Sequence, residues 1–133
     1  MTSPFNSLPF IRAGFPSPAD EHMEADLDYN AFFKRNPAAT MARRVQGHSM
    51  IDAFIPHNSI VVIDRSIKPI NNSIVAVTLD GETLIKHLVR AQDGHWLLPA
   101  NKRYKSIKLD EGRDFSVWGT VTHCIIEVFN QRI

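Results

Sequence analysis

The stretch SIVAVTLDGETLIKHLV, residues 73–89, decides the fold class of this chain. Two runs rich in Val, Ile, Leu and Thr flank the dipeptide Asp80-Gly81. Such runs favour β-strands, and Asp-Gly favours the tight primed turns that join antiparallel strands. The stretch therefore predicts a β-hairpin.

Short runs of similar composition recur from residue 41 onward, separated by Gly, Asn, Asp and Pro. Their pattern predicts strands at 41–45, 60–64, 74–79, 83–89, 96–98 and 116–129, the last of them bent or bulged. Several short strands at this spacing indicate a mostly β domain, built as a partly closed barrel or sandwich.

The beginning of the chain differs in composition. Residues 1–27 are rich in Pro, Ser and Phe, and their prolines exclude a continuous helix or a central strand. We expect a flexible arm over residues 1–30 and a β-rich domain over residues 31–133. One short helix is predicted at 28–36, where Asp28 would cap its start and Pro37 would limit its end.

Composition and charge narrow the class of protein. The chain has 133 residues, of which 44% are hydrophobic and 22% are charged, as expected for one globular domain. Its net charge of +1 provides no strong field, so we expect no strong direct binding to nucleic acid. The single cysteine, together with the lack of an export leader and of an apolar membrane span, predicts a cytoplasmic protein.

Ser49 is the first candidate functional residue, in the stretch RVQGHSMIDAFIP at 44–56. A serine just after a strand and a glycine is typical of a solvated turn, but also of a nucleophile beside converging backbone N–H groups. Such a nucleophile needs a base, and adjacent His48 would point away from it. One set of candidates pairs a histidine with an orienting carboxylate: His87 or His123 with Asp52, Asp64 or Asp80.

Lys86 is the other candidate base. Strand alternation places it between Leu84 and Leu88 on one face of the predicted hairpin. Burial disfavours the charged form of a lysine and lowers its pKa, so a buried Lys86 could act as a general base. The alternative is an edge-strand lysine whose ammonium group reaches water.

Three ordered blocks, GFPSPAD at 14–20, GHSMID at 47–52 and DGETLIKHL at 80–88, resemble the UmuD and LexA family of self-cleaving peptidases. The resemblance covers nearly the whole chain from about residue 13. It implies a serine-lysine dyad, in which Ser49 is the nucleophile and Lys86 the general base. The backbone N–H groups of Ser49 and His48 would form the oxyanion hole.

The same resemblance implies that the substrate is the chain's own arm, cut between Ala13 and Gly14, with no metal and no cofactor. The cut could occur within one chain or between two. His48 departs from the acidic residue usual in UmuD.

The resemblance also implies partners: a second copy of the chain in a homodimer, a RecA filament on single-stranded DNA that stimulates cleavage, and a UmuC-type Y-family DNA polymerase. The cleaved product would then serve translesion synthesis and mutagenesis in the SOS response to DNA damage. Two other readings stay open. The chain could be a non-enzymatic β-rich adaptor that binds a polymerase or repair partner through its arm, or a peptidase that acts on foreign substrates.

Overall fold

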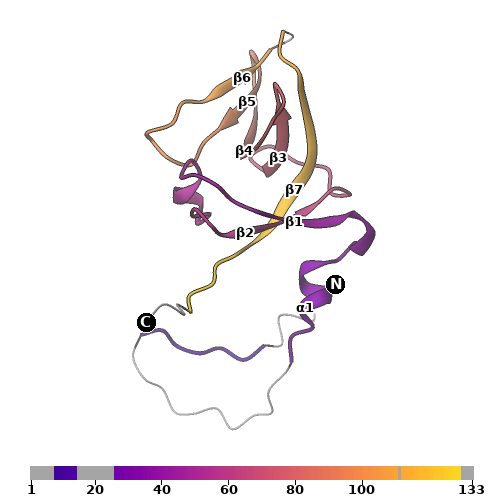
Figure 1. The fold of residues 1–133 in the computed structure, drawn as a ribbon, viewed down its shortest axis with the longest axis vertical. Helices are drawn as coiled ribbons and strands as arrows, with labels where there is room; N and C mark the ends of the chain where they lie inside the picture. The colour runs from indigo at the N-terminus through magenta and orange to yellow at the C-terminus, as the bar shows by residue number, and fades with distance from the viewer. Residues whose placement is uncertain (1–7, 15–25, 111, 130–133) are drawn as a thin grey trace. The chain divides into compact units, whose positions relative to one another are not determined.

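The computed structural model describes residues 8–14, 26–110 and 112–129 (Figure 1). The chain divides into two units, Met1–Arg35 and Asn36–Ile133. Much of the predicted arm, residues 1–7 and 15–25, lies outside the described residues. None of the described helices is long and apolar enough to cross a membrane.

The first unit contains the predicted short helix, α1 (Tyr29–Phe33). The side chain of Asp28 caps it by accepting a hydrogen bond of 3.1 Å from the amide N–H of Ala31, as predicted. The helix ends three residues earlier than predicted. Asn36 precedes a proline, and a residue in that position is kept out of helical geometry, so the chain leaves the helix before it.

The second unit is built on one antiparallel sheet, with β1 and β6 at its two edges. Among the described residues its seven strands are β1 (Thr40–Arg44), β2 (Ile60–Asp64), β3 (Ile74–Leu79), β4 (Glu82–Ala91), β5 (Gly94–Leu98), β6 (Ile107–Leu109) and β7 (Phe115–Ile125). Their order across the sheet is β1-β2-β7-β3-β4-β5-β6. Of the two short 3-10 helices in this unit, η2 (Pro37–Ala39) directly precedes β1, and η3 (Ile51–Ala53) lies between β1 and β2. The predicted mostly β fold is confirmed, and the sheet does not close.

The hairpin that the sequence indicates most clearly is present. Leu79 pairs with Glu82, and the register continues without interruption to Ile74 and His87. Both turn residues have positive φ, +50° at Asp80 and +86° at Gly81. That combination defines the primed turn predicted from Asp-Gly.

Strand β7 joins the two halves of the sheet, because β2 pairs with its later part and β3 with its earlier part (Figure 1). The register shifts once in each pairing, which confirms the predicted irregularity of this strand. Gly119 lies between the shifts, opposite Ala76. A Cβ at this glycine would overlap the Cγ2 methyl group of Ile63, so the close approach of the two strands requires glycine here.

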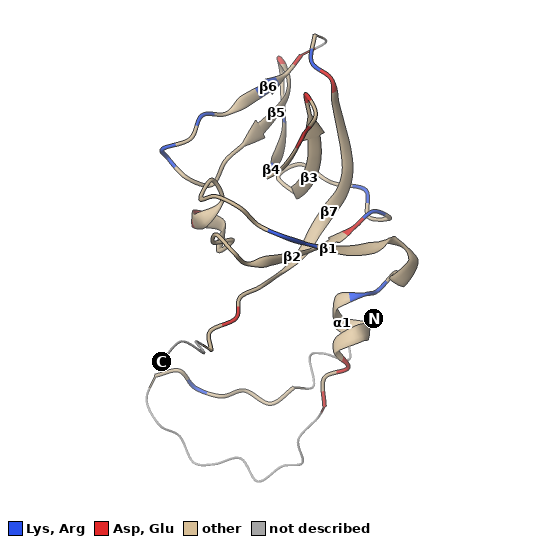
Figure 2. Cartoon of the chain, in the orientation of Figure 1, with Lys and Arg blue, Asp and Glu red and all other residues tan. Residues whose placement is uncertain are grey.

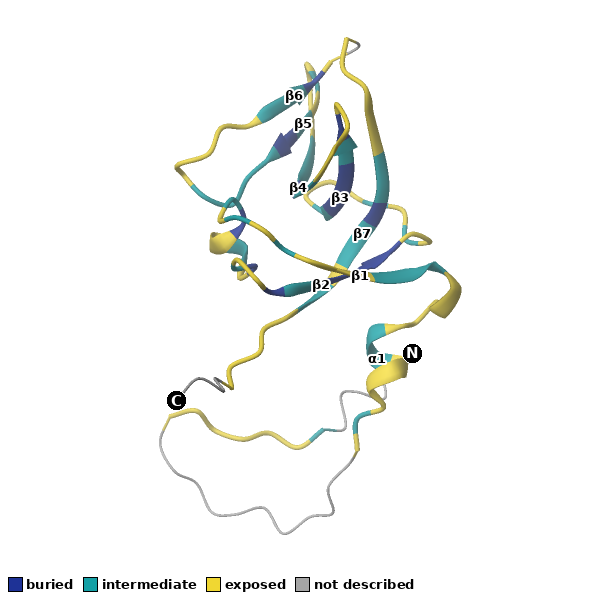
Figure 3. Cartoon of the chain, in the orientation of Figure 1, coloured by how far each residue is buried: buried dark blue, intermediate teal, exposed yellow. Residues whose placement is uncertain are grey.

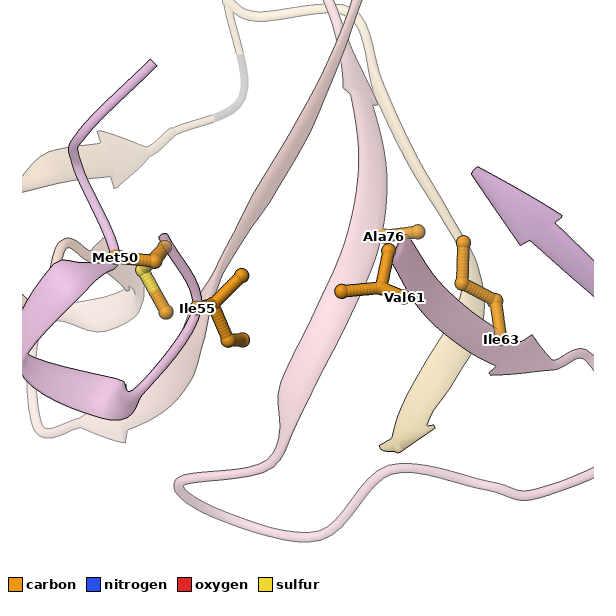
Figure 4. Close-up of a cluster of buried hydrophobic side chains, with 5 residues drawn as sticks. All are labelled: Met50, Ile55, Val61, Ile63 and Ala76. Atoms are coloured by element: carbon orange, nitrogen blue, oxygen red, sulfur yellow. The ribbon is translucent and has the colours of Figure 1, made fainter. Parts of the chain in front are cut away.

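Two buried hydrophobic clusters support the sheet, and both lie within the second unit (Figure 3). The first consists of Met50, Ile55, Val61, Ile63 and Ala76, which Figure 4 shows as sticks. The second consists of Val75, Val77, Leu79, Leu97 and Leu109. The two clusters take alternate residues of β3, since Ala76 belongs to the first and its neighbours belong to the second. Strand β3 therefore separates two layers of core.

Two strand predictions need correction. Strand β6 was not predicted, because its three residues stand among lysines and carry too short an alternating pattern to be distinguished from a loop. The predicted strand 116–129 ends at Ile125, which pairs with Ile60, the first residue of β2. Beyond that point β2 offers no partner, and the described residues 126–129 are exposed.

Charged residues of both signs are spread along the second unit (Figure 2). The ion pairs recorded among the described residues, Arg113–Asp80 at 2.7 Å and Lys108–Asp93 at 3.5 Å, are largely exposed. Pairs of this kind stabilise a fold by less than about 1 kcal/mol. The core, rather than the surface charge, therefore stabilises this unit.

Candidate active site

Ser49 lies on the loop between β1 and η3, and the chain is held on both sides of it. Before the serine, the amide N–H of Val45 donates to the carbonyl of Ser59 at 2.8 Å. After it, Met50 is buried and packs in the first core cluster with Ile55, whose N–H donates to the Met50 carbonyl at 3.2 Å (Figure 4). The position of the serine is thus set by the core beneath it.

The turn that carries Ser49 is also tied to the segment that follows β5. The carbonyl of Ser49 accepts from the amide N–H of Ala100, and the carbonyl of His48 accepts from the side-chain amide of Asn101, both at 2.8 Å. The N–H of Asp52 donates to the carbonyl of Ala100, also at 2.8 Å. These contacts occupy the carbonyl groups of the turn.

The N–H groups of the same turn stay available. Those of His48 and Ser49 donate to no acceptor among the residues that the structure describes. The preceding residue, Gly47, has φ of +99°, a conformation that residues with a Cβ rarely adopt. Available N–H groups on consecutive residues of such a turn can stabilise a developing oxyanion.

Lys86 lies on β4 and contacts Ser49 directly. It is the one residue of β4, a strand described throughout, that is buried, with 8% of its surface exposed. Its Nζ donates a hydrogen bond of 2.6 Å to the Oγ of Ser49. The edge-strand lysine with an ammonium group in water is therefore not what the structure contains.

Burial lowers the pKa of Lys86 below the ordinary value for lysine. No ion pair to this lysine is recorded among the described residues, so no nearby carboxylate offsets the cost of burying its charge. A lysine in this environment releases its proton at lower pH than a solvated one. A neutral amine within hydrogen-bond distance of a hydroxyl can take the proton of that hydroxyl.

Two clefts, each of about 550 Å³, meet at the Ser49–Lys86 pair. One extends toward the β3–β4 hairpin and is lined by Asp80, Glu82 and Arg113. The other extends toward β1 and is lined by Arg44 and Trp118 among others. An extended peptide passing the pair could therefore place side chains on both sides of it.

The alternative bases lie elsewhere. His87 is adjacent to Lys86 on β4 and so faces the other side of the sheet, where its Nδ1 lies 3.1 Å from the carbonyl of Asn72. His123 is on β7 opposite Val62, with Nδ1 2.8 Å from the Oγ1 of Thr122. The structure does not show a histidine-based triad at Ser49.

Two of the three candidate orienting carboxylates, Asp64 and Asp80, are engaged by other side chains, whereas Asp52 makes no side-chain hydrogen bond or ion pair among the described residues. The two oxygens of buried Asp64 accept from the backbone N–H and hydroxyl of Ser66 and from the side chain of Asn36. Asp80 pairs with Arg113. These two carboxylates fix the ends of strands.

The predicted cleavage site belongs to the first unit. Ala13 and Gly14 are exposed there, and no atom lies within 4 Å of a Cβ built on Gly14. The remainder of the GFPSPAD block, residues 15–20, lies outside the described residues. The described residues contain no cluster of His, Cys, Asp or Glu placed to hold a metal ion.

Sequence reasoning missed the residues that support the turn, among them Ala100, Asn101 and His57. The first two follow a predicted strand, and no local pattern connects them with Ser49. His57 follows Pro56 and carries no local signal, because its contact with Gly47 depends on a turn that only the folded chain forms.

Comparison with known proteins identifies the family. The model of the Peptidase S24-like family matches residues 7–122. The MucA protein of Salmonella typhimurium is 35% identical over 127 residues, which cover 92% of this chain and 86% of MucA. The SamA protein of Salmonella typhimurium strain LT2 is 37% identical over 110 residues, covering 83% and 76%. A LexA repressor of Magnetococcus marinus is 33% identical over 111 residues, covering 84% of this chain and 47% of the repressor. The chain therefore belongs to the S24 family of self-cleaving serine peptidases, the family of UmuD and LexA.

Proposed function

We propose that this protein is a self-cleaving serine peptidase that cuts its own chain between Ala13 and Gly14. The contact of 2.6 Å between the Lys86 Nζ and the Ser49 Oγ, with the lysine buried, carries this proposal. Lys86 is the general base and Ser49 the nucleophile. Membership of the S24 family supports the same assignment.

The reaction proceeds through an acyl-enzyme. Neutral Lys86 takes the hydroxyl proton of Ser49, and the Oγ attacks the carbonyl carbon of Ala13. The N–H groups of His48 and Ser49 stabilise the resulting oxyanion. Lys86 then gives its proton to the nitrogen of Gly14, and the bond between the two residues breaks.

In deacylation, water is the nucleophile and Ser49 is the leaving group. Lys86 takes a proton from water as that water attacks the ester carbonyl, and it then gives this proton to the Ser49 Oγ as the ester bond breaks and the fragment ending at Ala13 leaves. The complete reaction breaks one peptide bond and consumes one water molecule. Each chain performs this reaction once on its own arm or on that of a second copy.

The test is to incubate the purified protein between about pH 7 and 10 and to measure its intact mass and its new N-terminus. We expect a product that begins at Gly14 and a rate that rises with pH as the amine loses its proton. Ser49→Ala and Lys86→Ala should each abolish cleavage in a folded protein. Lys108→Ala removes an exposed amine from β6 and serves as the matched control that still cleaves.

Two results would count against the proposal. Cleavage at the same bond in Ser49→Ala would exclude Ser49 as the nucleophile. A flat pH profile with the fold intact would exclude Lys86 as the general base. An unchanged mass in every condition, including incubation with RecA, single-stranded DNA and nucleotide, would favour the non-enzymatic adaptor.

We further propose the biological setting on the basis of the family. The protein acts as a homodimer in the SOS response, RecA filaments on single-stranded DNA stimulate its cleavage, and the product serves a UmuC-type Y-family polymerase in translesion synthesis. RecA, single-stranded DNA and nucleotide should therefore accelerate cleavage at neutral pH. The cleaved form should bind such a polymerase more tightly than Ser49→Ala does, as measured by co-purification of the two proteins.

A further inference from the structure

His57 contacts the turn that carries Ser49 at Gly47, two residues before the serine. The amide N–H of Gly47 donates a hydrogen bond of 2.9 Å to the Nδ1 of His57. A ring nitrogen that accepts a hydrogen bond carries no proton, so the imidazole is neutral and has its proton on Nε2. The contact can therefore exist only while His57 is uncharged.

This hydrogen bond lies between two points at which the backbone of the turn is anchored. The backbone is anchored at Val45 by the strand-like contact with Ser59, and again at His48 by Asn101. Between those two anchors, the described residues form one hydrogen bond, the one from Gly47 to His57. It holds the residue whose φ of +99° begins the turn. The two N–H groups proposed for the oxyanion hole follow directly.

Among the described residues, no carboxylate forms an ion pair with His57. The side chain is exposed, and the ring centroid of His48 lies 5.4 Å away. The guanidinium group of Arg44 donates a hydrogen bond of 2.7 Å to the carbonyl of Asn58, the residue that follows His57. Asp52, the carboxylate of η3, makes no side-chain contact recorded among the described residues. Protonation would thus place a new cation beside a second imidazole.

We propose that His57 is a positioning residue that holds the Ser49 turn only in its neutral form, so that acid weakens self-cleavage independently of Lys86. This inference rests on the peptidase proposed above and concerns the same site. Once Nδ1 carries a proton, the N–H of Gly47 faces a second N–H instead of an acceptor. The turn loosens, and the oxyanion donors are no longer held in place.

The experiment compares two substitutions over about pH 5 to 9. In His57→Asn the amide oxygen takes the place of Nδ1, accepts from Gly47 and does not titrate in this range. His57→Leu removes the acceptor. Loss of neutral Lys86 lowers the logarithm of the cleavage rate by at most one per pH unit. Below about pH 6.5, the cleavage rate of the wild-type protein should fall a further three- to tenfold beyond that effect.

His57→Asn should cleave at the wild-type rate above about pH 7.5 and should lack the additional fall. His57→Leu should cleave three- to tenfold more slowly at every pH, and its rate should also lack the additional fall. His95→Asn, which changes an exposed histidine on β5, is the matched control and should keep the additional fall. An unaltered pH profile in both His57 variants, or an additional fall that persists in His57→Asn, would overturn the proposal.

A second measurement is independent of activity and uses Ser49→Ala, whose chain stays intact. Amide hydrogen exchange at Gly47 should accelerate about three- to tenfold when His57→Leu is added, relative to the amide of Val45, and should stay slow with His57→Asn. Equal exchange in all three proteins would exclude the contact. If no variant cleaves at all but exchange behaves as expected, the peptidase assignment fails and the His57 contact stands.

Discussion

At the scale of single residues, the site depends on a charge that the fold makes costly. Lys86 is buried between partly buried neighbours on β4, and burial lowers its pKa. Protonation of Lys86 is therefore less favourable in the folded chain than in the unfolded chain. Between the lowered pKa and the ordinary value of 10.5 the unfolded chain binds more protons, so the free energy of unfolding rises with pH in that window.

This difference predicts the effect of Lys86→Met. The variant removes the buried charge and keeps most of the apolar stem, so we expect its free energy of unfolding at pH 7 to exceed that of the wild type by about 1 to 3 kcal/mol. The advantage should shrink as the pH rises and the wild-type amine loses its proton. Urea denaturation of both proteins at several pH values measures it, and a variant less stable at every pH contradicts the argument.

At the scale of elements, β7 determines how the two halves of the sheet meet. It pairs with β2 and β3 through two register shifts, and Gly119 lies between them. The glycine is buried, and Ile63, whose methyl group occupies the space a Cβ would need, is fully buried as well. A fully buried side chain in a packed core has little room to move away.

Gly119→Ala should therefore destabilise the protein by about 1 to 3 kcal/mol, as overpacking of a core does. Gly112→Ala is a matched control, because nothing lies within 4 Å of a Cβ built there and its φ is not positive. Denaturant midpoints of the two variants give the comparison. If both variants are as stable as the wild type, the approach of β7 to β2 is less tight than the structure indicates.

At the scale of the whole molecule, the described core belongs to one of the two units. All members of the two buried clusters, and the loop and strand that supply Ser49 and Lys86, lie in Asn36–Ile133. In the first unit, α1 contains no buried residue. The second unit thus holds both the stabilising core and the proposed catalytic pair.

We therefore expect a chain that begins at Asn36 to fold alone. Its thermal midpoint should lie within about 6 °C of that of the intact protein, which corresponds to roughly 1 kcal/mol for a domain of this size. Calorimetry of the two chains provides the measurement. A fragment that is unfolded at room temperature would show that the first unit contributes to stability.

Much of the sheet could be predicted from the sequence because strand alternation and turn chemistry are local. The bounds of β2 and β3 agree with the prediction, and the Asp80-Gly81 turn has the expected conformation. Strand β6 could not be predicted, since three residues show too little pattern until β5 pairs with them. The candidates Ser49 and Lys86 could be named from three short blocks and a family resemblance, whereas His57 and Asn101 had no local signal.

The sequence by itself determined most of the segments that become strands, the dipeptide that turns the hairpin, and the serine and lysine that are the candidates, because each of these depends on residues close together in the chain. Only the tertiary structure decided that Lys86 is buried and that its amine lies 2.6 Å from the serine oxygen. The physical reason is that burial and distance depend on how distant strands pack. The pKa of a lysine follows from that packing rather than from its neighbours in sequence.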